Sequence, residues 1–495
     1  MSKNLLSKST FIRSLQCQKS LYLYKRHTYL RDKISEEQQA IFNRGHSVGE
    51  LAQKLFPGGV DAGWKTPRQY KKSVNLTQKY IADGKKVIYE AAFLYNDILV
   101  ALDILVKRED GWHAYEVKSS LQPSETFLRD AALQNHVITK SGFPLKSFSL
   151  VHLNRDYVRG AKLELDGLFK IIDVTEQVAE RALSVISGIY MAKETLRYRE
   201  IPPMDIGRHC FTPYPCDFQQ FCWKHVAEKS VFQLSELEDD RKWHLYKQGI
   251  VEAKDIPQDF PLTRKQKIQL DYFHKDETYL DKPAIRKYTE SAKFPAAFLH
   301  ISSARPAVPP ISGLRPYQNL PFAFSLTKLG HICAEPEKYF YLAPEKPGLQ
   351  EDMLKQFLEA TKDIQTIFIY GQPNELRVLK DCAQKYPAFT DEVGKRLRKV
   401  IDLAEVFQKK YLYHARLSAD CSMLSVLPVL GIDNQLENGG IRSEYMAGVA
   451  YETLFDVKDL FGGFDTKLKL QHYISAQAAH IYEVWKMLRE AALSE

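Results

Sequence analysis

Three charged residues, Asp103, Glu116 and Lys118, have the types and the spacing that phosphodiester hydrolysis requires. The residues between Asp103 and Glu116 indicate the end of one strand, a charged turn that ends at Gly111, and the start of a second strand. Such a hairpin can bring the three side chains together. Two carboxylates can then hold a hard divalent cation, while the ammonium of Lys118 positions a water or stabilises charge on a phosphate. An edge hairpin with ordinary solvated charges is the alternative.

Four cysteines form a second candidate site. Cys210, Cys216 and Cys222 lie in a short stretch that also holds two prolines and therefore cannot be a continuous helix. Three thiols are one ligand short, and Cys17 is the only other cysteine in the first half of the chain. Four thiolates suit either a structural zinc ion or an iron–sulfur cluster, and either would join the two ends of the domain that holds the acidic hairpin.

The other cysteines carry no such signal. Cys333, Cys382 and Cys421 are far apart in apolar surroundings, so we expect them to be buried small residues. Seven cysteines in 495 residues are sparse and no secretory signal precedes them, which argues against a disulfide framework.

Composition predicts a cytoplasmic protein without a membrane span, because no apolar run approaches the roughly 20 residues that a span needs. The formal net charge of +8 favours a polyanionic partner without establishing one.

These motifs resemble those of the iron–sulfur branch of the RecB-like nucleases in the PD-(D/E)XK superfamily. In that branch one N-terminal and three C-terminal cysteines bracket the nuclease motifs and hold a [4Fe-4S] cluster. The resemblance therefore implies iron rather than zinc at Cys17, Cys210, Cys216 and Cys222. More closely, the chain resembles a bacterial family that joins such a nuclease to a C-terminal domain similar to an RNase H-like exonuclease.

The resemblance also assigns roles to acidic residues. Asp103, Glu116 and Lys118 match the family's catalytic hairpin without a gap. This match implies that Asp103 and Glu116 bind Mg²⁺ or Mn²⁺ and that Lys118 orients the attacking hydroxide. Glu50 matches the first motif on a helix and could reach the metal. Glu90 occupies the family's acidic position on the preceding strand, with a supporting role.

Two positions depart from the family pattern. Many RecB-like enzymes have a metal-binding histidine where this chain has Gly49, and His46, one helical turn away, is expected to point elsewhere. Gln134 matches the superfamily's catalytic glutamine motif, although the usual aromatic does not follow it. Asp130 lies four residues before Gln134, on the same helical face. A solvated amide on an amphipathic helix is the alternative for Gln134.

The elements that position these residues follow from periodicity and turn signals. We expect helices over 1–56, a helix over 67–83, strands over 86–95, 98–107 and 112–118, a helix around Gln134, strands over 146–153 and 168–174, and one long helix over 175–198. The result is a mixed sheet flanked by helices, which is an α/β fold.

Three regions are expected along the chain. They are a RecB-like PD-(D/E)XK nuclease with its cysteines over 1–225, a helical linker over 226–290 and an RNase H-like α/β domain over 291–495. Within the linker, Leu245–Ile250 and Ile256–Pro257 are spaced like a small helix-hairpin-helix, which would present backbone amides to a phosphate. An ordinary connector between helices is the alternative.

The third region departs from its family at the metal-binding strand. The resemblance runs through Phe298–Ser303, Gly313–Phe322, Ile367–Gly371 and Val400–Leu403. Where the family has an Asp-x-Glu pair, this chain has His300 and Ser302, although Asp402 and Glu375 remain. Losing two carboxylates removes the charge that holds two cations, so we expect an inactive domain. A rewired site that uses His300 is the alternative.

Together these observations predict a metal-dependent DNA nuclease that acts on single-stranded or end-accessible DNA and contains a structural iron–sulfur cluster. A non-catalytic nucleic-acid-binding or assembly scaffold built from nuclease folds is the main alternative, and a zinc-stabilised interaction module is a third. A helicase or other DNA-processing partner is left open.

Overall fold

Two structural units make up the chain, and each is described by itself. The computed structural model describes residues 4–494, with the exception of 65, 67, 68, 418, 419, 437–439 and 457–459. Unit 1 comprises Met1–His225 together with Ala307–Tyr317, and unit 2 comprises Val226–Pro306 together with Gln318–Glu495. Residues 226–290 therefore belong to unit 2.

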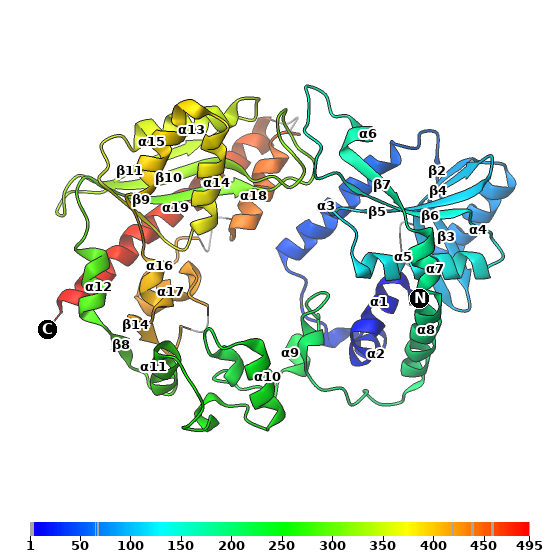
Figure 1. The fold of residues 1–495 in the computed structure, drawn as a ribbon, viewed down its shortest axis with the longest axis horizontal. Coiled ribbons are helices and arrows are strands. Elements are labelled where there is room, and N and C mark those ends of the chain that lie inside the picture. Colours follow the sequence, from blue (N-terminus) through cyan, green and yellow to red (C-terminus); the bar gives the residue numbers. More distant parts are fainter. Residues whose placement is uncertain are drawn as a thin grey trace. The chain divides into compact units, whose positions relative to one another are not determined.

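A mixed sheet carries the acidic hairpin in unit 1 (Figure 1). Its strands are β1 (Leu6–Ser7), β2 (Val60–Asp61), β3 (Val87–Tyr95), β4 (Ile98–Arg108), β5 (Gly111–Lys118), β6 (Ser147–Leu153) and β7 (Phe169–Asp173). They lie in the order β2-β3-β4-β5-β6-β7, with β1 beside β4. Neighbours β3, β4 and β5 are antiparallel, whereas β5 and β6 are parallel. The five strands expected between residues 86 and 174 are confirmed, and the sequence does not predict β1 and β2.

Helices cover both faces of this sheet, which confirms the expected α/β class. They are α1 (Lys8–Gln16), α2 (Gln18–Arg26), α3 (Glu36–Gln53), α4 (Tyr70–Ala82), α5 (Glu125–Lys140), α6 (Leu165–Leu168), α7 (Thr175–Glu180), α8 (Ala182–Arg197) and α9 (Gln219–Cys222). Residues of α5 share one buried cluster with the sheet, and residues of α3 share another on the opposite face. Residues 67 and 68, expected at the start of α4, lie outside the described residues.

The single helix expected over 175–198 is instead two helices. α7 ends at Glu180 and α8 begins at Ala182, with Arg181 between them. No glycine or proline marks this break in the sequence. The Arg181 guanidinium binds the carboxylate of Glu125 at the start of α5, at 2.7 Å, so tertiary contacts accompany a break that local propensity does not predict.

Close packing between α1 and α8 sets the position of α1. A Cβ atom at Gly188 in α8 would lie 2.9 Å from Leu15 Cδ2 and 3.0 Å from Phe11 Cε2, both on α1. The two helices therefore approach within a distance that only glycine allows. This contact matters for the site, because α1 begins at Lys8 and ends next to Cys17.

Unit 2 is built on a second sheet. Its strands are β9 (Ala296–Ala304), β10 (Leu320–Leu329), β11 (Glu337–Leu342), β12 (Thr366–Ile369) and β13 (Val400–Asp402), and β8 (Thr278–Leu280) pairs separately with β14 (Leu412–His414). The order is β11-β10-β9-β12-β13, with β12 parallel to both of its neighbours. On one face the long helix α19 (Leu460–Leu493) packs on Phe298 and Phe368; on the other, α13 (Leu349–Ala360) and α14 (Pro373–Gln384) pack on Leu299.

The remaining helices of unit 2 are α10 (Asp239–Lys247), α11 (Arg264–Tyr272), α12 (Lys282–Thr289), α15 (Pro387–Leu397), α16 (Ala404–Gln408), α17 (Met423–Val429) and α18 (Glu444–Thr453). The close helix pair expected around Gly249 does not form. α10 ends at Lys247, and only the 3-10 turn Ala253–Asp255 precedes α11. A second full helix would be needed for a helix-hairpin-helix.

The three remaining cysteines and the described helices also bear on the sequence predictions. Cys382 is buried as expected and Cys421 is partly buried, but Cys333 is exposed, so its expected burial is wrong. None of the described helices combines the length and the apolar character that a membrane span requires.

Replacing Gly188 by leucine tests the α1–α8 contact. We expect the free energy of unfolding to fall by about 1–3 kcal/mol, because the new side chain must displace Phe11 or Leu15. Gly49→Ala in α3 is the matched control, since its Cβ meets nothing within 4 Å. That change should leave stability equal or raise it by up to about 1 kcal/mol through helix propensity. Denaturant unfolding measures both, and an unchanged Gly188→Leu midpoint would contradict close packing.

Candidate active site and thiol cluster

The acidic hairpin opens between β4 and β5. Their ladder ends at the pair Ile104–Tyr115. Two residues beyond Tyr115, the backbone N–H of Val117 donates to the side-chain Oδ2 of Asp103 at 2.6 Å instead of to a backbone oxygen of β4. The side chain of Asp103 thus replaces a backbone partner at the point where the two strands separate.

In β3 and β4, the alternation of side chains between the two faces of the sheet is interrupted next to Asp103. In β3, Ile88 and then Ala91 and Phe93 belong to the buried cluster beneath α5, so the alternation shifts by one residue at Glu90. In β4 the same cluster contains Leu102 and Leu105, so the shift falls next to Asp103. Regular strands alternate strictly, and a shift in both strands re-aims the side chains at that level.

Glu90 is the residue that makes this shift in β3. Its φ of +53° is rare for a residue other than glycine, and strained backbone of this kind concentrates at functional sites. Glu90 lies opposite Asp103, between the pairs Tyr89–Ile104 and Ala91–Leu102.

Glu116 is a buried carboxylate held by two lysines. Its side chain is 2% exposed, and its Oε1 lies 2.7 Å from Lys118 Nζ and 3.0 Å from Lys8 Nζ. Burial alone would raise the pKa of Glu116. The charges of Lys118 and Lys8 outweigh burial and hold the pKa well below its ordinary value, so Glu116 is ionised.

Lys118 is fixed on its other side by α5. Its Nζ donates to Asp130 Oδ2 at 2.6 Å, and burial, which would lower the pKa of Lys118, is outweighed by the charges of Asp130 and Glu116. The predicted face shared by Asp130 and Gln134 therefore points at the hairpin.

Gln134 is fully buried, so the alternative of a solvated amide is wrong. Its carboxamide is close enough to Glu116 to affect the pKa of that carboxyl. Burial raises this pKa, the two lysines lower it most, and Gln134 lowers it further. Neither amide atom makes a hydrogen bond of normal geometry in the described part of the chain, and the same holds for Asp130 Oδ1. Buried polar atoms without partners are typical of a site that awaits a water, ion or substrate.

Asp103 and Glu90 have raised pKa values for a common reason. Burial, followed by the charge of Glu116, raises the pKa of Asp103 to about 8. Burial is also the main cause at Glu90, whose pKa rises to about 7, against the opposing charge of Lys8. A divalent cation would relieve this shared repulsion, which is the electrostatic signature of a metal site or an acid–base site.

A cavity of about 310 Å³ lies beside these acids, on the side of α3. Its acidic lining residues are Glu50, Asp61, Glu90 and Asp103. His46 also lines it and is exposed. Glu116, Lys118 and Gln134 are not among its lining residues. The predicted site residues thus form two groups: Glu50, Glu90 and Asp103 line the cavity, whereas Glu116, Lys118 and Gln134 lie together beside it. The two groups are linked by the repulsion between Asp103 and Glu116.

Sequence reasoning missed two charged residues of this site, Lys8 and Asp61. Asp61 is in the short strand β2, and its carboxylate accepts the N–H of Gly63 at 2.7 Å. Neither residue lies in a recognisable motif. In the described part of the chain, no group of three or more His, Cys, Asp or Glu side chains has a geometry that could hold a metal ion. The side chains would have to move to form a complete site.

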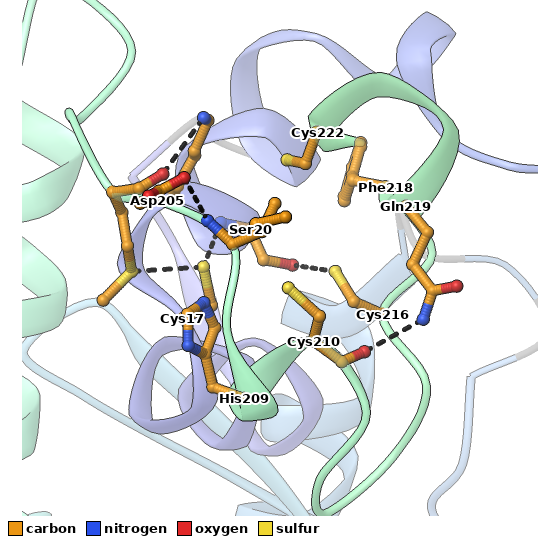
Figure 2. Close-up of a pocket in the computed structure, with 12 residues that line it drawn as sticks. Cys17, Ser20, Asp205, His209, Cys210, Cys216, Phe218, Gln219 and Cys222 are labelled. Carbon is orange, nitrogen blue, oxygen red and sulfur yellow. Dashed lines mark hydrogen bonds between the residues drawn. The ribbon is translucent and has the colours of Figure 1, made fainter. Parts of the chain in front are cut away.

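The four predicted cysteines come together in a second place. Cys17, Cys210, Cys216 and Cys222 line one cavity, and their sulfur atoms face a common space in Figure 2. All four are free thiols. Burial, and then the neighbouring sulfurs, raise the pKa of Cys17 to about 11, while a hydrogen bond from the Ser20 N–H opposes the rise. The contributions of Cys216 and Cys210 to this rise indicate that their sulfurs lie near Cys17.

Contacts from α1 hold the C-terminal cysteine segment in place. Asp217, next to Cys216, is bound by the guanidinium groups of Arg13 and Arg31. The amide of Gln16 donates to the backbone oxygens of His209 and Tyr214, each at 2.7 Å. These bonds keep the two ends of unit 1 together even without a bound group.

Of the acids that remain in unit 2, Asp402 serves local structure. Asp402 Oδ1 accepts the backbone N–H groups of Gly371 and Ala404 at 2.8 and 2.9 Å. His300 Nε2 lies 3.2 Å from Glu444 Oε2, and Ser302 Oγ donates to the same oxygen at 3.1 Å. His300 and Ser302, which stand where the family carries two acids, therefore both form hydrogen bonds to Glu444.

The raised pKa values of Asp103 and Glu90 predict a pH dependence of stability in chelator. Folding favours their protonated forms, so the stability they contribute is full below about pH 4 and is lost as the pH rises through 7 and 8. The metal-free protein should melt at a higher temperature at pH 6 than at pH 9. Asp103→Asn should reduce that difference, whereas the exposed control Asp156→Asn should not. An equal difference in both variants would contradict the burial of Asp103.

Comparison with known proteins adds a partial match. A family model described as a domain of unknown function (DUF2779) matches residues 297–422. The matched segment begins in β9 and ends beyond β14, so it includes the positions of His300, Ser302 and Asp402. No curated protein matches the chain at a significant level. The similarity therefore concerns the sheet of unit 2 and names no activity.

Proposed function

We propose that the protein is a metal-dependent nuclease that hydrolyses phosphodiester bonds of DNA at the acidic hairpin of unit 1. The observation that carries this proposal is the set of buried Glu116 and partly buried Asp103 and Lys118, with Asp103 and Glu116 at the point where β4 and β5 separate. Removing these charges from water costs free energy, and each charge needs partners to offset that cost. A costly charged set of this kind is expected where it serves a function.

The donor set fits Mg²⁺ or Mn²⁺. Asp103 and Glu116 would bind the cation, and Glu50 is the acid on α3 that lines the neighbouring cavity. Carboxylate oxygens are the ligands that these hard cations prefer, and the raised pKa values of Asp103 and Glu90 indicate acids that lack a counter-charge. When bound, such a cation polarises the phosphate and lowers the pKa of a coordinated water.

Lys118 supplies the positive charge that this reaction needs. Asp130 and Glu116 hold its ammonium in one position, so the charge is preorganised and little side-chain freedom remains to be lost. From there Lys118 would orient the attacking hydroxide. Gln134, whose amide has no hydrogen-bond partner of normal geometry, would bind a water or a phosphate oxygen beside it.

We further propose a PD-(D/E)XK fold for unit 1 and an inactive RNase H-like fold for unit 2. The mixed sheet between α3 and α5 supports the first assignment. The second assignment is supported by His300 and Ser302, which stand where the family has its two acids and which both hydrogen-bond to Glu444. The substrate proposed is single-stranded or end-accessible DNA, in keeping with the net charge of +8.

A non-catalytic scaffold is the second candidate, and one observation favours it. Glu116 forms ion pairs with two lysines, so its charge is balanced without a metal. A scaffold would have no need for Lys118 to face both Glu116 and Asp130, which is why we prefer the enzyme.

A cleavage assay separates the two candidates. Protein purified without oxygen should cleave labelled single- or double-stranded DNA when Mn²⁺ is added. Glu116→Ala and Lys118→Ala should each lower the rate by at least ~100-fold, the effect of removing a preorganised charge from an active site. Lys33→Met removes one exposed positive charge and should retain activity. Cleavage that survives both active-site changes would favour the scaffold.

We also propose that Cys17, Cys210, Cys216 and Cys222 bind a structural [4Fe-4S] cluster. The four sulfurs line one cavity, and thiolates are the ligands of such clusters. Zinc is the alternative for the same donors.

Cys17→Ser tests this assignment. The wild-type protein should absorb at the blue end of the visible range, which zinc does not, and the variant should lose that absorbance together with its iron. Because thiolate ligation contributes folding free energy, the variant should lose stability on the order of several kcal/mol. Cys333→Ser, at an exposed cysteine, is the matched control and should keep both. Equal melting temperatures with and without iron would contradict a structural role.

A further inference from the structure

Lys8 is a cation bound to the proposed metal ligand. Its Nζ lies 3.0 Å from Oε1 and 3.2 Å from Oε2 of Glu116, so one ammonium contacts both oxygens of the carboxylate. Lys8 reaches this position from the first residue of α1, 108 residues away in the chain.

The same ammonium also neutralises the neighbouring acids. Its pKa is raised because the charges of Glu116, Asp103 and Asp130 outweigh the effect of burial. Its contact with both oxygens of Glu116 places the Lys8 ammonium where a divalent cation bound by that carboxylate would have to lie. A divalent cation and the Lys8 ammonium next to the same buried carboxylate would repel each other strongly, because the surroundings screen their charges poorly.

We propose that Lys8 is a built-in counter-ion of Glu116 that a divalent cation must displace in order to bind. The inference rests on the proposed function only in taking Glu116 as a metal ligand. Glu116 does not line the cavity that Asp103, Glu90 and Glu50 share; its oxygens contact Lys8 and Lys118 instead.

The side chain of Lys8 has a path along which to leave. Its side chain is 26% exposed, compared with 2% for Glu116, so part of it already reaches solvent. A lysine side chain has four rotatable bonds, and its position at the start of α1 allows this movement while the helix stays in place. Lys118 has no such freedom, because Asp130 holds its ammonium from the opposite side.

Direct measurement of Mn²⁺ binding tests the proposal without an activity assay. Electron paramagnetic resonance of free Mn²⁺ gives the dissociation constant for wild type, Lys8→Met and the charge-matched control Lys33→Met. We expect Lys8→Met to bind Mn²⁺ about tenfold more tightly, the factor that 1.4 kcal/mol of removed competition represents. Lys33→Met should match wild type, since that lysine is exposed.

The direction of the change distinguishes competition from a structural role, because losing a structural contact would weaken binding. Equal or weaker Mn²⁺ binding by Lys8→Met, or no binding by either protein, would overturn the proposal. Tighter binding in a protein that cleaves no DNA would support it while the proposed function failed.

A second measurement needs no variant and so does not depend on how Lys8→Met folds. Acylation of wild-type lysines, read by mass spectrometry, should modify Lys8 several-fold faster when Mn²⁺ is present, because the displaced ammonium is no longer held against Glu116. Labelling of Lys33 should not change. A Lys8 labelling rate that stays constant while Mn²⁺ binds would overturn the proposal.

Discussion

The buried negative charge of Glu116 is the constraint on which unit 1 depends. A carboxylate removed from water must have compensating charges, and here they come from Lys118 on the same strand and Lys8 on α1. Lys118 in turn needs Asp130 on α5. One charge near the C-terminal end of β5 therefore determines which parts of two helices must approach the sheet.

Helix α1 links this site to the thiol cluster. It begins at Lys8, and the residue that caps its C-terminus is Cys17. Nine helical residues at about 1.5 Å each give a separation of roughly 13 Å between the two ends. A cluster that fixes Cys17 therefore also fixes the position from which Lys8 reaches Glu116, which gives a structural cluster a direct bearing on the acidic site.

The sequence predicts the strands and the hairpin because their signals are local. Alternation and a glycine-ended turn are enough to place Asp103 near Glu116. It does not predict Lys8, whose contact with Glu116 spans 108 residues. The shift of face at Glu90 is equally hidden, since it requires a positive φ that glutamate rarely adopts. In the same way, Ala307–Tyr317 belongs to unit 1 through contacts that no local pattern records.

The most direct test of the account is the position of a bound metal. Crystals soaked in Mn²⁺ and measured at a wavelength where manganese scatters anomalously would locate it without reference to activity. The account predicts one strong anomalous peak within direct coordination distance of carboxylate oxygens of both Asp103 and Glu116. A fully soaked crystal without a peak between those two residues would contradict it.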